Sequence, residues 1–65
     1  MTTLMAQLLD EISRNEQLVL SYDDIPTGAF GAILIRQDLA DAKAAISNGD
    51  TVEMIRLYLT LQENK

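Results

Sequence analysis

The sequence lacks cysteine, histidine and tryptophan, and its 65 residues include one proline and three glycines. Without cysteine and histidine, disulfides and the usual zinc sites are excluded. A domain this short has a small core and usually needs a disulfide, a metal or a partner chain for stability. Helix packing and self-association are the sources of stability that remain. We therefore expect no metal and no other cofactor.

Cations are also scarce, since five basic side chains stand against ten acidic ones and give a formal net charge of −5. Binding to nucleic acid is unlikely, because affinity for a phosphate backbone comes mainly from Lys and Arg. Binding to anionic lipid is disfavoured for the same reason, and the longest apolar stretch, Ala29–Ile35, is too short to span a bilayer. The first residues lack a basic segment and a long apolar run, so we expect no signal peptide and a cytoplasmic location.

What the chain does contain is apolar side chains, at 48% of its residues. That share is generous for a domain with so little interior, and part of it should remain exposed in a monomer. We therefore expect a homo-oligomer, with a dimer favoured and the second or third helix at the shared surface.

The N-terminal segment predicts a short amphipathic helix over residues 3–14. Its apolar residues recur at i, i+3, i+4 and i+7, which is the pattern of one helix face; they are Met5, Leu8, Leu9 and Ile12. The hydroxyl of Thr2 or Thr3 can cap its first turn. Asn15 is a plausible helix stop, because Asn tolerates the left-handed conformation found at many helix ends.

Residues 15–25 are predicted to form a connection, and their conformation is open. Leu18, Leu20 and Tyr22 alternate with other residues as a strand would. A single strand would leave its backbone hydrogen-bonding groups unpaired within one chain. We interpret the segment as an apolar connection packed under the helices, with a strand paired across a dimer as the alternative.

A second helix is predicted over residues 26–47. Pro26 suits a first helical turn, and Asp23 and Asp24 would then lie near the positive end of the helix dipole. One stripe runs along the whole segment through Ala32, Ile35, Leu39, Ala42 and Ile46. The first half is apolar on its other side as well, through Phe30, Ile33 and Leu34, so we expect that half to be enclosed.

Asn48 and Gly49 predict the end of the second helix, and Asp50 predicts the cap of a third over residues 51–62, with Glu53 at the capping-box position. Val52, Ile55 and Leu59 form one apolar stripe of this helix. Other apolar residues widen it greatly, namely Met54, Leu57, Tyr58 and Leu61. The short connection predicts that helices two and three form an antiparallel hairpin. The expected fold is therefore all-α, a single small domain of three helices.

Gly28 and Gly31 lie at or near the start of the second helix, where each glycine costs about 1 kcal/mol relative to alanine. Two interpretations are open. The glycines either permit a close crossing with the third helix or with a second copy, or they only loosen a frayed helix start. The spacing matches neither of the glycine-rich phosphate-binding motifs.

The candidate contact residues follow from these faces. The predicted interface consists of Tyr22, Phe30, Gly31, Leu34, Met54, Leu57, Tyr58 and Leu61. Tyr is enriched at interfaces as an anchor, and Tyr22 is the favoured one here. A predicted acidic rim, which would speed association with a basic partner, consists of Asp23, Asp24, Asp38 and Asp41.

Three of the five cations are weaker candidates for contacts with an anion. Arg36 and Lys43 are seven residues apart and share a helix face, and Arg56 lies on the third helix. Copies of the chain could bring these side chains together around an anionic metabolite or nucleotide. We find no catalytic set, because paired carboxylates need a cleft to act as acid and base and 65 residues build little cleft. We therefore do not expect an enzyme.

The sequence is most consistent with a small acidic module that binds a partner protein and modulates it. Phage and plasmid accessory proteins often have this size, and we expect a protein of that kind. An oligomeric binder of small anions is the alternative. A helix-turn-helix that binds DNA is a remote alternative, because the third helix offers only Arg56 as a contact.

Overall fold

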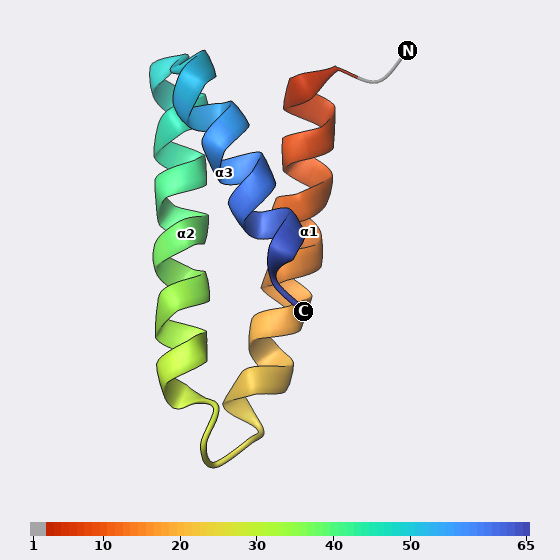
Figure 1. Cartoon of the computed structure of the whole chain (residues 1–65), viewed down its shortest axis with the longest axis vertical. Helices are drawn as coiled ribbons and strands as arrows, with labels where there is room; N and C mark the ends of the chain where they lie inside the picture. Colours follow the sequence, from red (N-terminus) through yellow and green to blue (C-terminus); the bar gives the residue numbers. More distant parts are fainter. Residues whose placement is uncertain (1–2) are drawn as a thin grey trace.

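The computed structural model describes residues 3–65 and contains three α-helices packed on one another, with no strand in that range. α1 spans Leu4–Asp23, α2 spans Ala29–Asn48 and α3 spans Thr51–Glu63 (Figure 1). The all-α prediction is confirmed. No helix among residues 3–65 combines the length and hydropathy needed to cross a membrane.

α1 continues nine residues beyond the predicted end at residue 14, so the prediction of an apolar connection over residues 15–25 is wrong for its larger part. Thr3 caps the helix as predicted, since its Oγ1 accepts a hydrogen bond from the amide of Ala6 at 3.1 Å. Thr2, the other predicted cap, lies outside the described residues.

Asn15 accounts for the difference between the predicted length of the helix and its observed length. It is fully buried inside α1, at the position where the stripe of Leu8, Ile12, Val19 and Tyr22 requires a core residue. Its Nδ2 donates to the carbonyl of Glu11 one turn earlier, at 2.8 Å, so it belongs to the helix and does not end it. With Asn15 included, the spacing of 4, 3, 4 and 3 is helical throughout.

The connection between α1 and α2, which we call the first turn of the chain, covers Asp24 to Gly28. α2 begins at Ala29, three residues later than predicted. Pro26 lies in this turn and not in the helix. Asp23 is the last residue of α1 and Asp24 is its C-cap. The two carboxylates therefore lie at the negative end of one helix dipole, and the prediction that they lie at the positive end of another is wrong.

The second turn of the chain, between α2 and α3, has the helix end and the helix cap that the sequence predicts. Gly49 adopts the left-handed conformation with φ of 65°, and the amide of Asp50 returns to the carbonyl of Ala45 at 3.0 Å. Asp50 then caps α3 by accepting a hydrogen bond from the amide of Glu53 at 3.2 Å. The Glu53 carboxylate does not close the capping box, because it accepts hydrogen bonds from Arg56.

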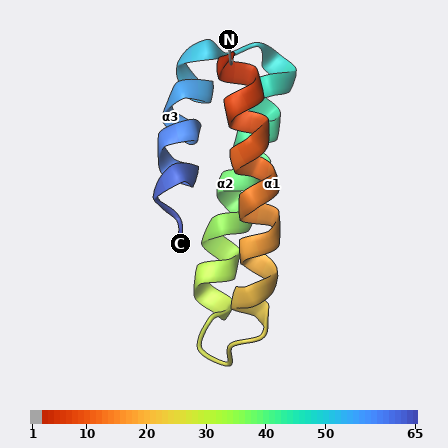
Figure 2. The same ribbon diagram turned by 90° about the vertical axis from the view of Figure 1, so that its right-hand side faces the viewer.

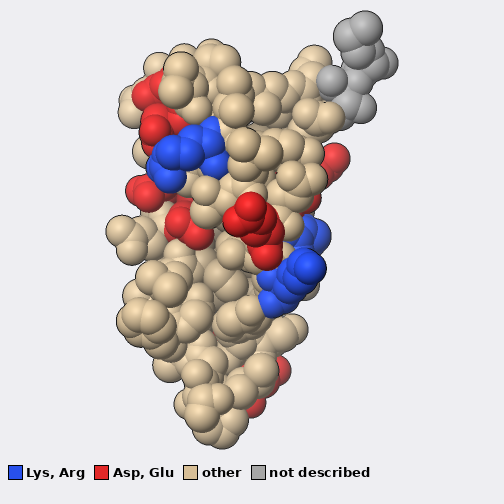
Figure 3. Space-filling model, in the orientation of Figure 1, with Lys and Arg blue, Asp and Glu red and all other residues tan. Residues whose placement is uncertain are grey.

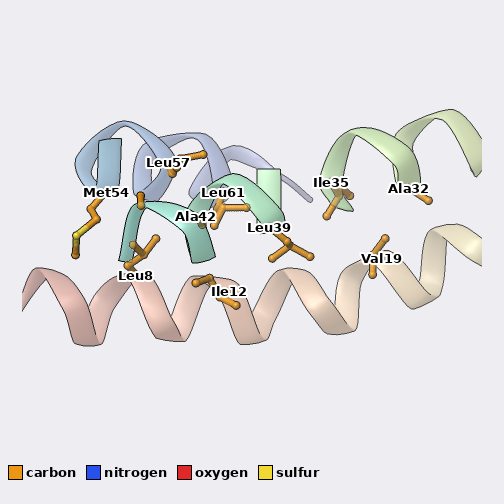
Figure 4. Packing of buried hydrophobic residues seen from close by; sticks show 11 residues of the cluster. Leu8, Ile12, Val19, Ala32, Ile35, Leu39, Ala42, Met54, Leu57 and Leu61 are labelled. Carbon is orange, nitrogen blue, oxygen red and sulfur yellow. The ribbon is translucent and has the colours of Figure 1, made fainter. Parts of the chain in front are cut away.

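Figure 4 shows how the core is divided along the molecule. Met54, Leu57 and Leu61 of α3 pack near Leu8 and Ile12 of α1, together with the second half of α2. Beyond them, Val19 faces Ile35 and Ala32 in the first half of α2. The alanines of α2 let the neighbouring helices approach closely; the buried ones are Ala32, Ala42 and Ala45.

α3 covers only one half of the α1–α2 pair, because it is shorter. At 1.5 Å per residue, α1 and α2 are each about 30 Å long and α3 is about 20 Å long. The two ribbon views agree that α3 ends near the middle of the pair (Figures 1 and 2). The end of the molecule that holds the first turn is therefore built from two helices only.

The C-terminal end of α3 is held by side chains of α1. Arg14 Nη2 donates to the carbonyl of Leu61 at 2.6 Å, and Asn15 Nδ2 donates to the same carbonyl at 3.1 Å. Asn64 Nδ2 completes the network by donating to Asn15 Oδ1 at 3.0 Å. The last carbonyls of a helix have no partner inside it, so these contacts cap α3 from outside. Within residues 3–65, every buried side-chain nitrogen and oxygen has a hydrogen-bond partner.

We expect Asn15→Ala to lower the free energy of unfolding by about 1–3 kcal/mol. The substitution removes buried hydrogen bonds and leaves the side-chain amide of Asn64 without its acceptor. Chemical denaturation followed by circular dichroism measures the change. Gln17→Ala, at an exposed position of the same helix, is the control and should change stability by no more than about 0.5 kcal/mol. Equal stability of the two variants would contradict a stabilising role for the network.

Candidate protein-interaction surface

Within residues 3–65, ten large apolar side chains remain exposed, and they are the candidates for a functional surface. They are Met5, Leu9, Leu20, Ile25, Phe30, Ile33, Leu34, Val52, Ile55 and Leu59. Single exposed apolar residues are normal on any protein surface, whereas a contiguous group is a sign of binding. The question is therefore which of these residues lie together.

One group surrounds the end of the molecule that α3 does not cover. We call it the tip patch, and it consists of Ile25, Phe30, Ile33 and Leu34. Phe30 is 72% exposed and Ile33 is 61% exposed. Between Asp24 and Arg36 the sequence has no charged residue, and Figure 3 shows an uncharged surface over the first half of α2. The patch is thus both apolar and free of charge.

Helix geometry turns this group outward. The core of α2 uses Ala32, Ile35 and Leu39, whereas Phe30, Ile33 and Leu34 stand at i, i+3 and i+4 on the opposite face. The prediction that the first half of α2 is enclosed is therefore wrong. The helix is apolar on two faces, but the structure covers only one of them.

Tyr22 supports the tip patch from behind. A Cβ atom added to Gly31 would lie 2.7 Å from Cδ2 of the Tyr22 ring, so the missing side chain makes room for the ring. A Cβ atom on Gly28 would collide with the carbonyl oxygen of Tyr22. The glycines thus permit a close crossing, but the crossing is with α1 and not with the third helix or a second copy.

Tyr22 is half-buried in this position, and its hydroxyl donates to the backbone carbonyl of Lys65. Gly31 is half-buried against the Tyr22 ring. Of the predicted interface residues, Phe30 and Leu34 are the two that present a large exposed apolar side chain on α2. Tyr22 and Gly31 shape the surface and do not form its outermost part.

The predicted interface residues of α3 are placed differently. Met54, Leu57 and Leu61 are buried in the core, and Tyr58 is half-buried against it, so a partner cannot reach the first three in the folded chain. The exposed stripe is the other one, formed by Val52, Ile55 and Leu59. Both faces of this helix are apolar, and periodicity alone does not distinguish the core face from the exposed one.

Arg36 and Lys43, two of the candidate anion contacts, pair with carboxylates of α1. Arg36 Nη1 donates to Asp23 Oδ1 at 3.1 Å, and its Nη2 donates to Oδ2 of the same carboxylate. Lys43 Nζ lies 3.5 Å from Glu16 Oε2. Arg36 and Lys43 would each have to leave a carboxylate before binding a free anion.

Arg56, the third candidate, pairs with Glu53 of its own helix, with 2.7 Å between Nη2 and Oε2. Asp41 and Asp38 of α2 are also close enough to raise its pKa, although the hydrogen bond with Glu53 raises it most. Two members of the predicted acidic rim, Asp38 and Asp41, thus lie at the α2–α3 side, near Arg56. Asp23 and Asp24 lie at the end that carries the tip patch.

These ion pairs also change the acidity of their carboxyl groups. Hydrogen bonds from Arg36 lower the pKa of Asp23 below its usual value of 3.8, and hydrogen bonds from Arg56 lower the pKa of Glu53 below 4.5. Each shift stabilises the ionised carboxylate in the folded chain. No group of three His, Cys, Asp or Glu residues within residues 3–65 is arranged to hold a metal ion.

The sequence matches no family model, and neither a curated protein nor a solved structure matches the chain.

We expect Gly31→Ala to destabilise the fold by about 1–3 kcal/mol, because the new methyl group overpacks against the Tyr22 ring. The sign is informative, since Ala in place of Gly inside a helix otherwise stabilises by about 1 kcal/mol. A double-mutant cycle provides the control. In the Tyr22→Ala background the same substitution should become neutral or stabilising, and destabilisation in both backgrounds would contradict the proposed contact.

The Asp23–Arg36 pair predicts a pH dependence of stability. Because folding lowers the pKa of Asp23, its contribution is complete above pH about 4, the usual value of a free Asp, and is lost as the pH falls through the lower folded pKa. We expect Asp23→Asn to be less stable than the wild type at pH 7 and to approach it at pH 2. NMR titration of the Asp23 carboxyl group, with Arg36→Gln restoring its pKa towards 3.8, provides the direct measurement. An unchanged pKa in Arg36→Gln would refute the assigned cause.

Proposed function

We propose that the protein is a non-catalytic interaction module that docks on a partner protein through the tip patch. The observation that carries the proposal is Phe30, a large aromatic side chain that stands 72% exposed on a regular helix. Ile33 and Leu34 flank it on the same face. Aromatic side chains at the centre of an apolar group are frequent anchors of protein interfaces.

The backbone under the patch is well placed for docking. Phe30 belongs to the first turn of α2, which the glycine contacts with Tyr22 hold close to α1. A preorganised surface loses little conformational entropy on binding, so more of the contact energy appears as affinity. The patch therefore suits a partner that offers an apolar pocket.

The acidic charge of this chain indicates which residues surround the apolar pocket of the partner. Within residues 3–65, four of the ten acidic side chains are in ion pairs and six are not, and Asp24, beside the tip patch, is one of those six. We infer that the partner carries basic residues around its apolar pocket, since opposite charges speed association. Binding should therefore weaken at high salt.

The proposal includes self-association. The exposed apolar residues outside the tip patch, such as Leu9 and Leu20, are available for a second copy of the chain. We propose a homodimer in which α2 and α3 of each copy act as an antiparallel hairpin. The dimer would present two tip patches, as suits an accessory protein that modulates its target in the cytoplasm.

The test of docking uses a photoreactive amino acid at position 30 and, as a control, at position 17 of α1, which is exposed and outside the patch. We expect one specific crosslinked partner from position 30 and none from position 17. With that partner purified, Phe30→Ala should weaken the dissociation constant at least tenfold, which corresponds to about 1.4 kcal/mol.

Val52→Ala is the matched control for affinity, because Val52 is 76% exposed and lies on α3 outside the patch. It should change the dissociation constant less than about twofold, within the error expected for a neutral surface change of about 0.5 kcal/mol. Equal losses for Phe30→Ala and Val52→Ala would refute the patch as the docking surface. Crosslinks only between copies of the chain would refute a separate partner.

A further inference from the structure

The α1–α2 pair has a second open side, opposite α3. In Figure 2, α3 lies to one side of the pair and no element covers the other. We call this side the α1–α2 face, and its residues are Leu9, Glu16, Leu20 and Asp23 of α1 with Arg36 and Lys43 of α2. All six are exposed, and shallow hollows run between the two helices beside them.

The charges on this face are sorted by helix. Glu16 and Asp23 are on α1, and the cations that pair with them, Lys43 and Arg36, are on α2. Two acids and two bases cancel, so the net charge of −5 lies entirely on the rest of the chain. Two copies repel through most of their surfaces, but this face is neutral and carries both signs.

We propose that the α1–α2 face is covered by a second copy of this chain, related by a two-fold axis that runs parallel to the helices. Such a rotation places α1 of one protomer opposite α2 of its partner at the same height. Glu16 of one protomer then faces Lys43 of its partner, and Asp23 faces Arg36. A two-fold interface must be complementary to itself, and the sorted charges satisfy that condition.

This arrangement favours one axis over another. A two-fold axis across the helices would place α1 against α1 and α2 against α2, so the acids would face acids and the cations would face cations. The axis along the helices brings opposite signs together at both levels, and Leu9 and Leu20 become buried in the shared surface.

The size of the face is sufficient for a dimer. A standard interface buries roughly 800 Å² on each partner, which is about a fifth of the 4371 Å² exposed by the chain. Viewed down its shortest axis, as in Figure 1, the molecule extends over 38 and 22 Å, and the two helices of the face are each about 30 Å long. The inference rests on the proposed self-association and adds its surface and its symmetry.

The test is electrostatic complementation between two variants. Glu16→Lys with Asp23→Lys makes the face entirely positive, and Arg36→Glu with Lys43→Glu makes it entirely negative. We expect each variant alone to show a dimer dissociation constant at least tenfold weaker than the wild type, because like charges meet across the axis. An equimolar mixture should form a 1:1 heterodimer. Sedimentation equilibrium measures mass, and circular dichroism verifies that each variant remains helical.

The matched control for the all-positive variant is Asp10→Lys with Asp41→Lys, which raises the net charge by the same amount at exposed positions away from the face. It should dimerise as the wild type does, or more tightly as general repulsion falls. If an all-positive or all-negative variant does not fold, Glu16→Gln and Lys43→Gln replace them, and each should weaken the dimer without removing it.

The outcomes separate the two levels of the proposal. A wild-type chain that stays monomeric at millimolar concentration overturns self-association itself. A wild-type dimer that the charge changes on the face leave unaffected overturns the face but leaves self-association standing. Folded single-sign variants that dissociate but do not form a heterodimer on mixing overturn the two-fold axis.

Discussion

The capping of α3 by α1 is the interaction on which the rest of the structure depends. The last carbonyls of a helix have few partners inside it, and the Leu61 carbonyl accepts hydrogen bonds from Arg14 and Asn15 of α1 in addition to the one from the backbone amide of Asn64. These two residues lie near the middle of α1, so they fix where α3 stops along the bundle. The coverage of the α1–α2 pair follows from that point, and with it the surface that stays open.

The exposed end of the molecule is thus a consequence of unequal helix lengths. α1 and α2 have 20 residues each, and α3 has 13. Beyond α3, the pair keeps its own contact through Val19, Ala32 and the Tyr22–Gly31 crossing, so it stays ordered without a third helix. The outer side of α2 remains apolar there. In a chain with so small a core, this apolar surface contributes nothing to folding, which is the physical reason to assign it to binding.

Much of the fold could be predicted from the sequence, because helix periodicity and caps act locally. The predictions that Gly49 ends the second helix and that Asp50 caps the third are correct for this reason. The errors arise where a tertiary contact decides. A buried Asn15 looks like a helix end unless the Leu61 carbonyl it binds is known. On α3, both stripes are apolar, so only the packing shows that Met54 is inside and Val52 outside. Of the four residues of the tip patch, Phe30 and Leu34 belong to the interface that the sequence predicts. The other two could not be predicted, because α2 is apolar on two faces and the sequence does not say which one is covered.

The ion pairs between α1 and α2 connect the monomer to its proposed dimer. All four side chains are well exposed to solvent, between 38% and 59%, and exposed pairs contribute only about 0–1 kcal/mol, so the fold does not depend on them. That weakness makes them suitable for an interface, since exchanging Glu16 or Asp23 between a cation of its own chain and one of a partner costs little. Burial between two copies would then exclude water and strengthen the same attractions. The pairs therefore select the relative orientation of two copies, while the apolar residues between them supply the area.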